Sequence, residues 1–208
     1  MSLMFLFGAL IGGASASKAL SESPPGVAND QDKQVLQVAL LHLLAADDFD
    51  TDIGKKRAQH SVIVLSARTP ERTGMTRPEQ TQHDLAKGHR IPDDIQRDLL
   101  RRNEQPGIYH ARVASFRGLS FDRRIVISEI AKRSTRELFE SERVLFEKAY
   151  PTARGYAKAF LPGYSQDGSH AVVRALVGPS PHGGTATVLL QRIAGTWVVK
   201  WYDIAWYL

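Results

Sequence analysis

Hydrophobic residues near the C-terminus fall into three runs rich in β-branched and aromatic residues, separated by glycine-containing turns. The runs are 170–177, 185–192 and 196–208, with turns at 178–184 and 194–195. Such runs, joined by short turns, are typical of neighbouring antiparallel strands. The sequence therefore predicts a three-stranded C-terminal meander.

Three other segments have apolar residues at helical spacing. They cover residues 30–47, 92–102 and 134–149. Asn29 or Asp30 can cap the first segment, and Pro92 suits the first position of the second. Ser134 and Glu137 form a capping box for the third. We expect this last helix to pack on the apolar face of the meander.

Short apolar runs at 61–65 and 123–130 predict further strands, with a weaker candidate at 109–116, and 69–90 is expected to be a loop. Strands and helices do not alternate strictly. This order favours an α+β fold in which a few helices pack on an antiparallel sheet ending in the meander.

The last predicted strand carries its apolar residues in two phases. Trp197 and Trp201 share one phase, whereas Ile204 and Trp206 share the other. A β-bulge near Tyr202 and Asp203 would return these side chains to one face, where we expect them to form core.

The N-terminal residues resemble a secretory signal peptide. An apolar stretch too short to span a bilayer precedes an Ala14-Ser-Ala16 cleavage site. The residues before the stretch include no Lys or Arg, so a misannotated start or a short buried helix is the alternative to a signal peptide. The predicted organisation is a signal peptide at 1–16, a flexible tether at 17–32 and a single α+β domain at 33–208. The expected location is periplasmic or secreted, with no transmembrane anchor in the mature form.

Composition narrows the chemistry further. The chain has 208 residues, a formal net charge of +5 and no cysteine, which excludes disulfides, thiolate nucleophiles and zinc–cysteine sites. Its basic residues are scattered, and the denser groups at 55–57 and 101–102 lack interleaved aromatic residues. Nucleic acid is therefore an unlikely partner.

From about residue 33 onward the chain resembles an uncharacterised family of small exported bacterial proteins. The resemblance rests on residues 62–69, 91–94, 98–103, 146–151, 166–168, 171–173, 183–184, 189–190 and 195–199. These are turn and core signatures, so the resemblance implies a fold and brings no established function. Members often carry cysteines before the Gly-Gly turn, where this chain has Pro179-Ser-Pro181-His182.

Several motifs for catalysis or metal binding are incomplete. The acidic segment 48–54 begins like a calcium loop but lacks the required Gly and Glu. His182-Gly-Gly184 has no downstream nucleophile elbow, and His83, Asp84 and His89 lie in a segment without an apolar frame. The sequence thus predicts no metal site and no cofactor.

Three functional hypotheses remain. The first is an exported, non-enzymatic binding or accessory domain of the bacterial cell envelope, whose partner is a small molecule or an envelope protein. Its candidate binding residues are His182, Arg174, Arg101 and Arg102. The alternative is a small hydrolase-like enzyme with a histidine and a carboxylate in a pocket at the meander, whose catalytic residues the sequence does not identify. A weaker third idea is an anion-binding or nucleic-acid-binding module based on Arg101, Arg102 and Arg174.

Overall fold

The computed structural model describes residues 28–46, 61–70, 88–103, 114–129, 146–178 and 184–206. These residues form a seven-stranded mixed sheet and two helices, α1 (Asp30–Ala45) and α4 (Asp93–Asn103). Residues 146–149 add one helical turn. The strands are β1 (Val62–Ser66), β2 (Ile125–Ser128), β3 (Ala153–Ala159), β4 (Gly163–Tyr164), β5 (His170–Gly178), β6 (Gly184–Ile193) and β7 (Thr196–Trp206). The predicted α+β class and the C-terminal meander are confirmed.

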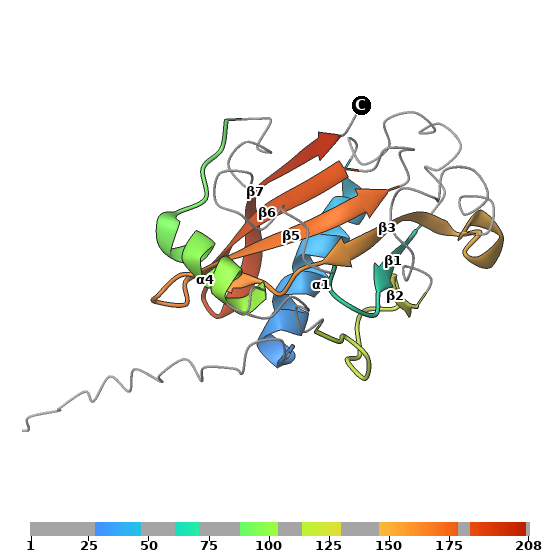
Figure 1. Ribbon diagram of the computed structural model, residues 1–208, viewed down its shortest axis with the longest axis horizontal. Coiled ribbons are helices and arrows are strands. Elements are labelled where there is room, and N and C mark those ends of the chain that lie inside the picture. The colour runs from blue at the N-terminus through green and yellow to red at the C-terminus, as the bar shows by residue number, and fades with distance from the viewer. Residues whose placement is uncertain are drawn as a thin grey trace, which may run out of the picture.

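The sheet has the order β2-β1-β3-β5-β6-β7, and β4 pairs with β5. The pairs β3–β5, β5–β6 and β6–β7 are antiparallel, whereas β1 pairs in parallel with both β2 and β3. Figure 1 shows the meander strands side by side. Parallel neighbours need a connection longer than a hairpin turn. The segments between β1 and β2 and between β2 and β3 are long enough for such connections.

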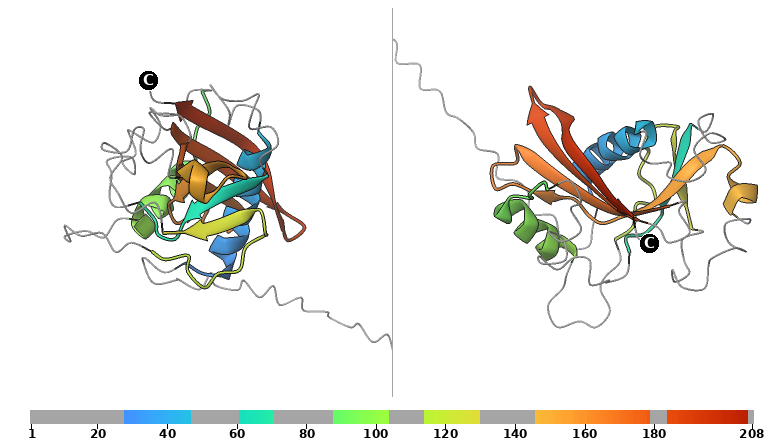
Figure 2. Two further views of the ribbon diagram at one scale, coloured as in Figure 1. Left: turned by 90° about the vertical axis from the view of Figure 1, so that its right-hand side faces the viewer. Right: turned by 90° about the horizontal axis from the view of Figure 1, so that it is seen from above.

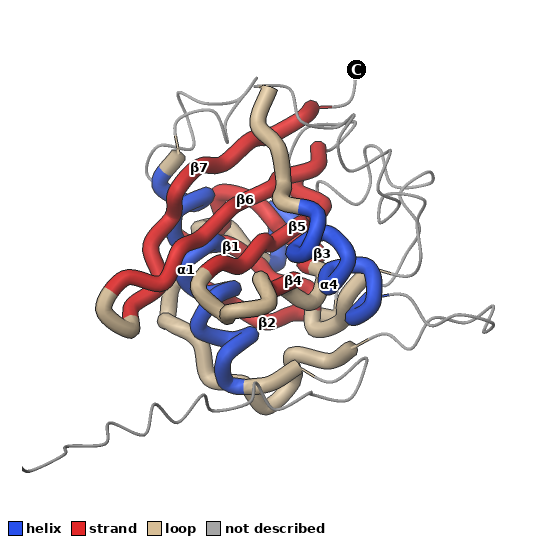
Figure 3. The backbone as a smooth tube through the Cα atoms, turned by 90° about the vertical axis from the view of Figure 1, so that its left-hand side faces the viewer, coloured by secondary structure: helices blue, strands red, loops and turns tan. Residues whose placement is uncertain are grey.

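The two helices cover opposite faces of the sheet (Figure 3). In the view from above the sheet bends around α1, and α4 lies on its outer side (Figure 2, right). The main core lies between α1 and the sheet and includes Leu36, Leu40 and Leu43, all wholly buried. A smaller apolar cluster joins Ile95 and Leu99 of α4 to the other face.

Helix α1 begins as the sequence predicts. Asn29 is its N-cap, and its side chain accepts a hydrogen bond from the backbone of Asp32, whose carboxylate accepts one from the Asn29 backbone. At the other end, the Arg154 guanidinium donates to the backbone carbonyls of Leu44 and Ala46. A cation is favourable there because helix C-terminal carbonyls carry partial negative charge.

A β-bulge divides β7 into two phases, as the sequence indicates, but it lies at Lys200, two residues before the predicted position. Leu190 pairs with Val199 while Leu189 pairs with Trp201, so Lys200 is the extra residue. The earlier bulge sends Trp201 to the face of α4, whereas Trp197 packs in the main core. The prediction that all these aromatic residues share one face was wrong.

Two further predictions lie mainly outside the described residues. Of the helix predicted at 134–149, the structure describes only its last turn, where Phe146 lies against the rings of Tyr150 and Tyr156. The described helix on the apolar face of the meander is α1. Of the weaker strand at 109–116, Ser115 forms one bridge, with Arg68.

Within the described residues, neither helix has the length and apolar character that a membrane span requires.

Candidate functional site

Three polar side chains form a row across the meander on the face opposite α1. Arg174 of β5 pairs in register with Thr187 of β6, which in turn pairs with Asp203 of β7. Residues directly opposite in an antiparallel pair project from the same face. The exposed fraction is 0% for Arg174 and 1% for each of the other two. We call these three residues the polar row.

The polar row borders an apolar row on one side only. On one side of it, Val172, Leu189 and Trp201 form the neighbouring row and pack with α4. On the other side lies a row in which Leu176 pairs with both Thr185 and Lys158. Thr185 is 1% exposed, and Lys158 is half-buried. Burial of a charged or polar group costs free energy unless partners replace its lost water.

The hydrogen bonding of the polar row is incomplete. Among the residues that the structure describes, Thr187 Oγ1 is a buried hydroxyl that forms no hydrogen bond. Arg174 and Asp203 take part in further interactions, and so does Thr185. An unsatisfied buried hydroxyl is uncommon in folded proteins and calls for an explanation.

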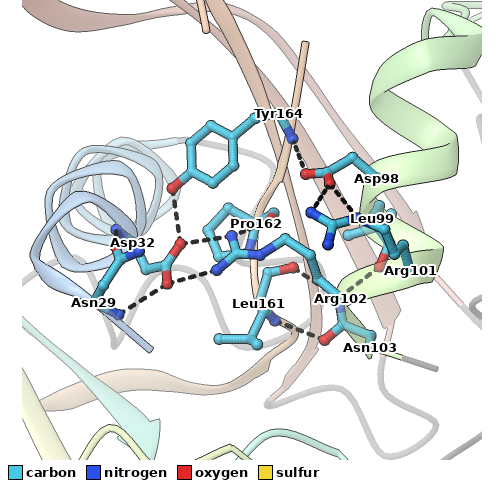
Figure 4. A network of polar contacts seen from close by, with 10 residues as sticks. All are labelled: Asn29, Asp32, Asp98, Leu99, Arg101, Arg102, Asn103, Leu161, Pro162 and Tyr164. Carbon is cyan, nitrogen blue, oxygen red and sulfur yellow. Dashed lines mark hydrogen bonds and ion pairs between the residues drawn. The ribbon is translucent and has the colours of Figure 1, made fainter. Parts of the chain in front are cut away.

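A second buried polar cluster joins α1, α4 and β4 (Figure 4). The Arg102 guanidinium donates to both carboxylate oxygens of Asp32, at 2.7 and 2.9 Å, and to the carbonyl of Pro162 at 2.6 Å. The Tyr164 hydroxyl donates to the same carboxylate at 2.8 Å. With the bond from the Asn29 backbone, the Asp32 carboxylate accepts four hydrogen bonds.

The electrostatics of this cluster keep its charges fixed. Burial lowers the pKa of the Arg102 guanidinium, but the hydrogen bonds and charge of Asp32 outweigh this effect and raise it. Burial, followed by the nearby Asp32 charge, raises the pKa of the Tyr164 phenol far above its ordinary value. The cluster links α1 to α4, which lie on opposite faces of the sheet, and its role is structural.

A third cluster occupies the turn before β5 and contains serine, histidine and aspartate. Ser169 Oγ lies 2.8 Å from His170 Nδ1, and it also lies 2.7 and 2.8 Å from the two carboxylate oxygens of Asp167. The Ser165 hydroxyl donates to the same carboxylate at 2.6 Å. Hydrogen bonds from Ser165 and Ser169 lower the pKa of Asp167 to about 2.

This order of contacts differs from that of a catalytic triad. In a triad, histidine lies between the nucleophile and the carboxylate, so that it can accept the nucleophile's proton. Here Ser169 lies between His170 and Asp167, and all three belong to one tight turn. The geometry is that of a turn stabilised by side-chain hydrogen bonds.

The structure separates the predicted binding residues. Arg101 is exposed and pairs with Asp98 at 2.7 Å, whereas its neighbour Arg102 is buried against Asp32. Arg174 lies in the polar row. His182 lies outside the described residues, as do the acidic segment 48–54 and two members of the His83–Asp84–His89 group.

His89 itself stacks on Trp201, with ring centroids 4.5 Å apart and the planes 7° from parallel. Within the described parts of the chain, no three histidine, aspartate or glutamate side chains are grouped closely enough to hold a metal ion. The stacked pair lies beside the polar row, because Trp201 and Asp203 are two residues apart on β7.

The sequence identified one member of the polar row and missed the other two. Arg174 was a candidate together with Arg101 and Arg102, and it is also a charge within the apolar run 171–177. The same signal marks Asp203, a charge between Tyr202 and Ile204. Thr187 carries no such signal, since threonine is common in strands.

Fold and site together define a small α+β protein with a buried polar row on one face of its meander. Comparison with known proteins adds no relative, since no protein-family model, no curated protein and no solved structure matches the chain. The resemblance to an uncharacterised exported family therefore stays a prediction.

Proposed function

We propose that this protein is an exported, non-catalytic domain that binds a small molecule in the bacterial cell envelope, and that the polar row is its binding site. The observation that carries the proposal is the wholly buried hydroxyl of Thr187, which forms no hydrogen bond among the described residues and lies between two buried charged residues.

The two buried polar clusters differ in a way that supports this proposal. In the Asp32–Arg102 cluster, the carboxylate accepts four hydrogen bonds, as expected where polar groups serve only to hold a fold together. The polar row instead retains unused hydrogen-bonding capacity at Thr187. Binding sites typically combine apolar walls with a few placed polar groups, and Val172 and Leu189 supply apolar walls here.

Export rests on the N-terminal sequence. Residues 1–16 have the apolar stretch and small-residue site of a signal peptide, and a polar tether follows. N-terminal sequencing of protein recovered from the periplasm or medium tests this part. A chain that begins near Ser17 supports export, and a chain that retains Met1 in the cytoplasm contradicts it.

Native mass spectrometry of protein purified from its own compartment tests the binding function. We expect a mass excess that denaturation removes, and we expect Thr187→Val to lower its occupancy without loss of folding stability. Thr185→Val is the matched control, because this residue is equally buried on the same strand but takes part in further interactions. We expect this control to lower stability. A wild-type protein that carries only its polypeptide mass would contradict the proposal.

A hydrolase is the second candidate, and the contact between Ser169 and His170 favours it. Ester hydrolysis by wild-type protein, lost about 100-fold or more in Ser169→Ala, would establish this activity. We expect neither, because the serine hydroxyl donates directly to Asp167 and the histidine does not lie between serine and carboxylate.

A further inference from the structure

We propose that the tip of the β6–β7 hairpin, residues 192–200, docks on the surface of a membrane that contains anionic lipid. This site is separate from the polar row, and it can bind whether or not the proposed function holds. Residues 192–200 are called the hairpin tip below.

The hairpin tip exposes two aliphatic side chains side by side. Among the residues that the structure describes, Ile193 and Val198 are the exposed large hydrophobic residues, at 55% and 38%. Ile193 pairs with Thr196 and Val198 pairs with Gln191, so the two aliphatic side chains are diagonal neighbours on one face. We call them the aliphatic pair. Exposed apolar side chains that adjoin one another, rather than being scattered, are a feature of interaction sites.

The hairpin tip is rigid and projects from the sheet. Ala194 and Gly195 both have positive φ, 48° and 84°, as a two-residue type I′ hairpin turn requires. The Arg192 guanidinium donates to the carbonyl of Gly195 at 3.3 Å. Residues 192–196 are all exposed, and Figure 3 shows the turn between β6 and β7 at the periphery of the described chain. The aliphatic pair is therefore held in place before a partner binds, so docking orders few groups.

Two cations flank the aliphatic pair. Arg192 and the bulge residue Lys200 are both exposed, and neither forms an ion pair within the described parts of the chain. The adjoining turn contributes one carboxylate, Asp167, which accepts hydrogen bonds from its own turn. Residues 165–170 and 191–200 thus hold two cations and one anion, which leaves a net charge of +1. This excess positive charge complements an anionic surface.

The form of the hairpin tip suits a lipid surface better than a protein partner. A stable protein interface buries about 800 Å² on each partner and centres on aromatic or arginine anchors in well-packed pockets. A projecting turn with two aliphatic side chains offers neither. A bilayer surface needs no matching shape: aliphatic side chains enter the acyl boundary while lysine and arginine reach the headgroups. Anionic headgroups add attraction for each cation.

A fluorescent label at the hairpin tip tests the docking. The chain contains no cysteine, so Thr196→Cys takes a polarity-sensitive dye at that position alone. The full chain is titrated with vesicles of phosphatidylcholine, with and without phosphatidylglycerol. We expect a saturating blue shift with phosphatidylglycerol vesicles and about 10-fold weaker binding or less to phosphatidylcholine alone, because two cations lose their anionic partners. Ala149→Cys is the matched control, on an exposed helical turn at the other end of the molecule (Figure 1), and should show no shift.

Variants of the labelled chain separate the two parts of the site. Ile193→Thr combined with Val198→Thr keeps β-branched side chains and should weaken binding about 10-fold or more, because apolar groups are lost. Arg192→Gln combined with Lys200→Gln should weaken it about 10- to 30-fold. Lys148→Gln removes an exposed cation far from the hairpin tip and should change the Kd less than about 2-fold, because salt screens distant charges. Urea midpoints equal to that of the wild type confirm that each variant is folded.

Several results would overturn the proposal. They are the absence of a dye shift with any vesicle, equal affinity for both vesicle types, and wild-type affinity in the variant without the aliphatic pair. A dimer in analytical ultracentrifugation that the same variant converts to a monomer also overturns it, because a second copy then covers the hairpin tip. None of these results affects the mass-spectrometric test of the polar row, so the two proposals fail separately.

Discussion

Replacement of Arg102 by methionine should strongly destabilise the protein. The side chain is 6% exposed and its partner Asp32 is 0% exposed, so the variant leaves a carboxylate buried without its counter-charge. Of the four hydrogen bonds to that carboxylate, two come from Arg102 and are lost, while those from the Asn29 backbone and Tyr164 remain. The carbonyl of Pro162 also loses its donor.

Breaking a buried ion pair from one side typically costs about 3 to 5 kcal/mol. A domain of this size is stable by only about 5 to 15 kcal/mol, so the variant should lose a large share of its stability. Urea unfolding followed by tryptophan fluorescence measures the loss. Salt at 1 M should change it little, because buried pairs are weakly screened.

Two further variants make the test specific. Arg101→Met, at the preceding residue, removes an exposed ion pair with Asp98 and should lower the free energy of unfolding by at most about 1 kcal/mol. Asp32→Asn combined with Arg102→Met removes both charges and should recover much of the loss, because the uncompensated carboxylate is gone. The reasoning is refuted if Arg102→Met is no more costly than Arg101→Met.

Three other predictions concern the core, a turn and a close contact. Trp197→Ala should lower the free energy of unfolding by about 3 to 5 kcal/mol, because this side chain is only 5% exposed and lies in the main core. Val198→Ala, on the surface, should be nearly neutral in the same urea assay. A Trp197→Ala loss below about 1 kcal/mol would place this tryptophan outside the core. Ser169→Ala should raise the pKa of Asp167 only part of the way from about 2 toward 3.8 in a carboxyl NMR titration, because the Ser165 hydroxyl and the Ser169 backbone N–H still donate to it. An unchanged pKa would contradict the hydrogen-bond assignment. The turn's extra stability is present above pH 3.8 and is lost as the pH falls through 2. Gly163→Ala should cost about 1 to 3 kcal/mol, since its Cβ would lie 2.7 Å from backbone atoms of α4, and a wild-type urea midpoint would show that the helix can move away.

The sequence by itself determined the elements whose signals are local. Asn29 and the apolar spacing after it predicted α1, the Pro92 segment predicted α4, and alternation between turns predicted the meander. Strand β3 was not predicted, because its alternate positions are alanine and glycine, which give little apolar signal. It exists through pairing with β1, which is distant in sequence, and with β5, which follows β4.

The two buried polar clusters arise from contacts between segments that are far apart in the sequence or on different strands. Asp32 and Arg102 are 70 residues apart, and no local pattern links them. The polar row depends on strand register, and register on β7 depends on the bulge at Lys200, which places Trp201 and Asp203 on the face of α4. A shift of one residue turns a side chain to the other face of a sheet, so the residues that meet there are fixed by pairing rather than by composition.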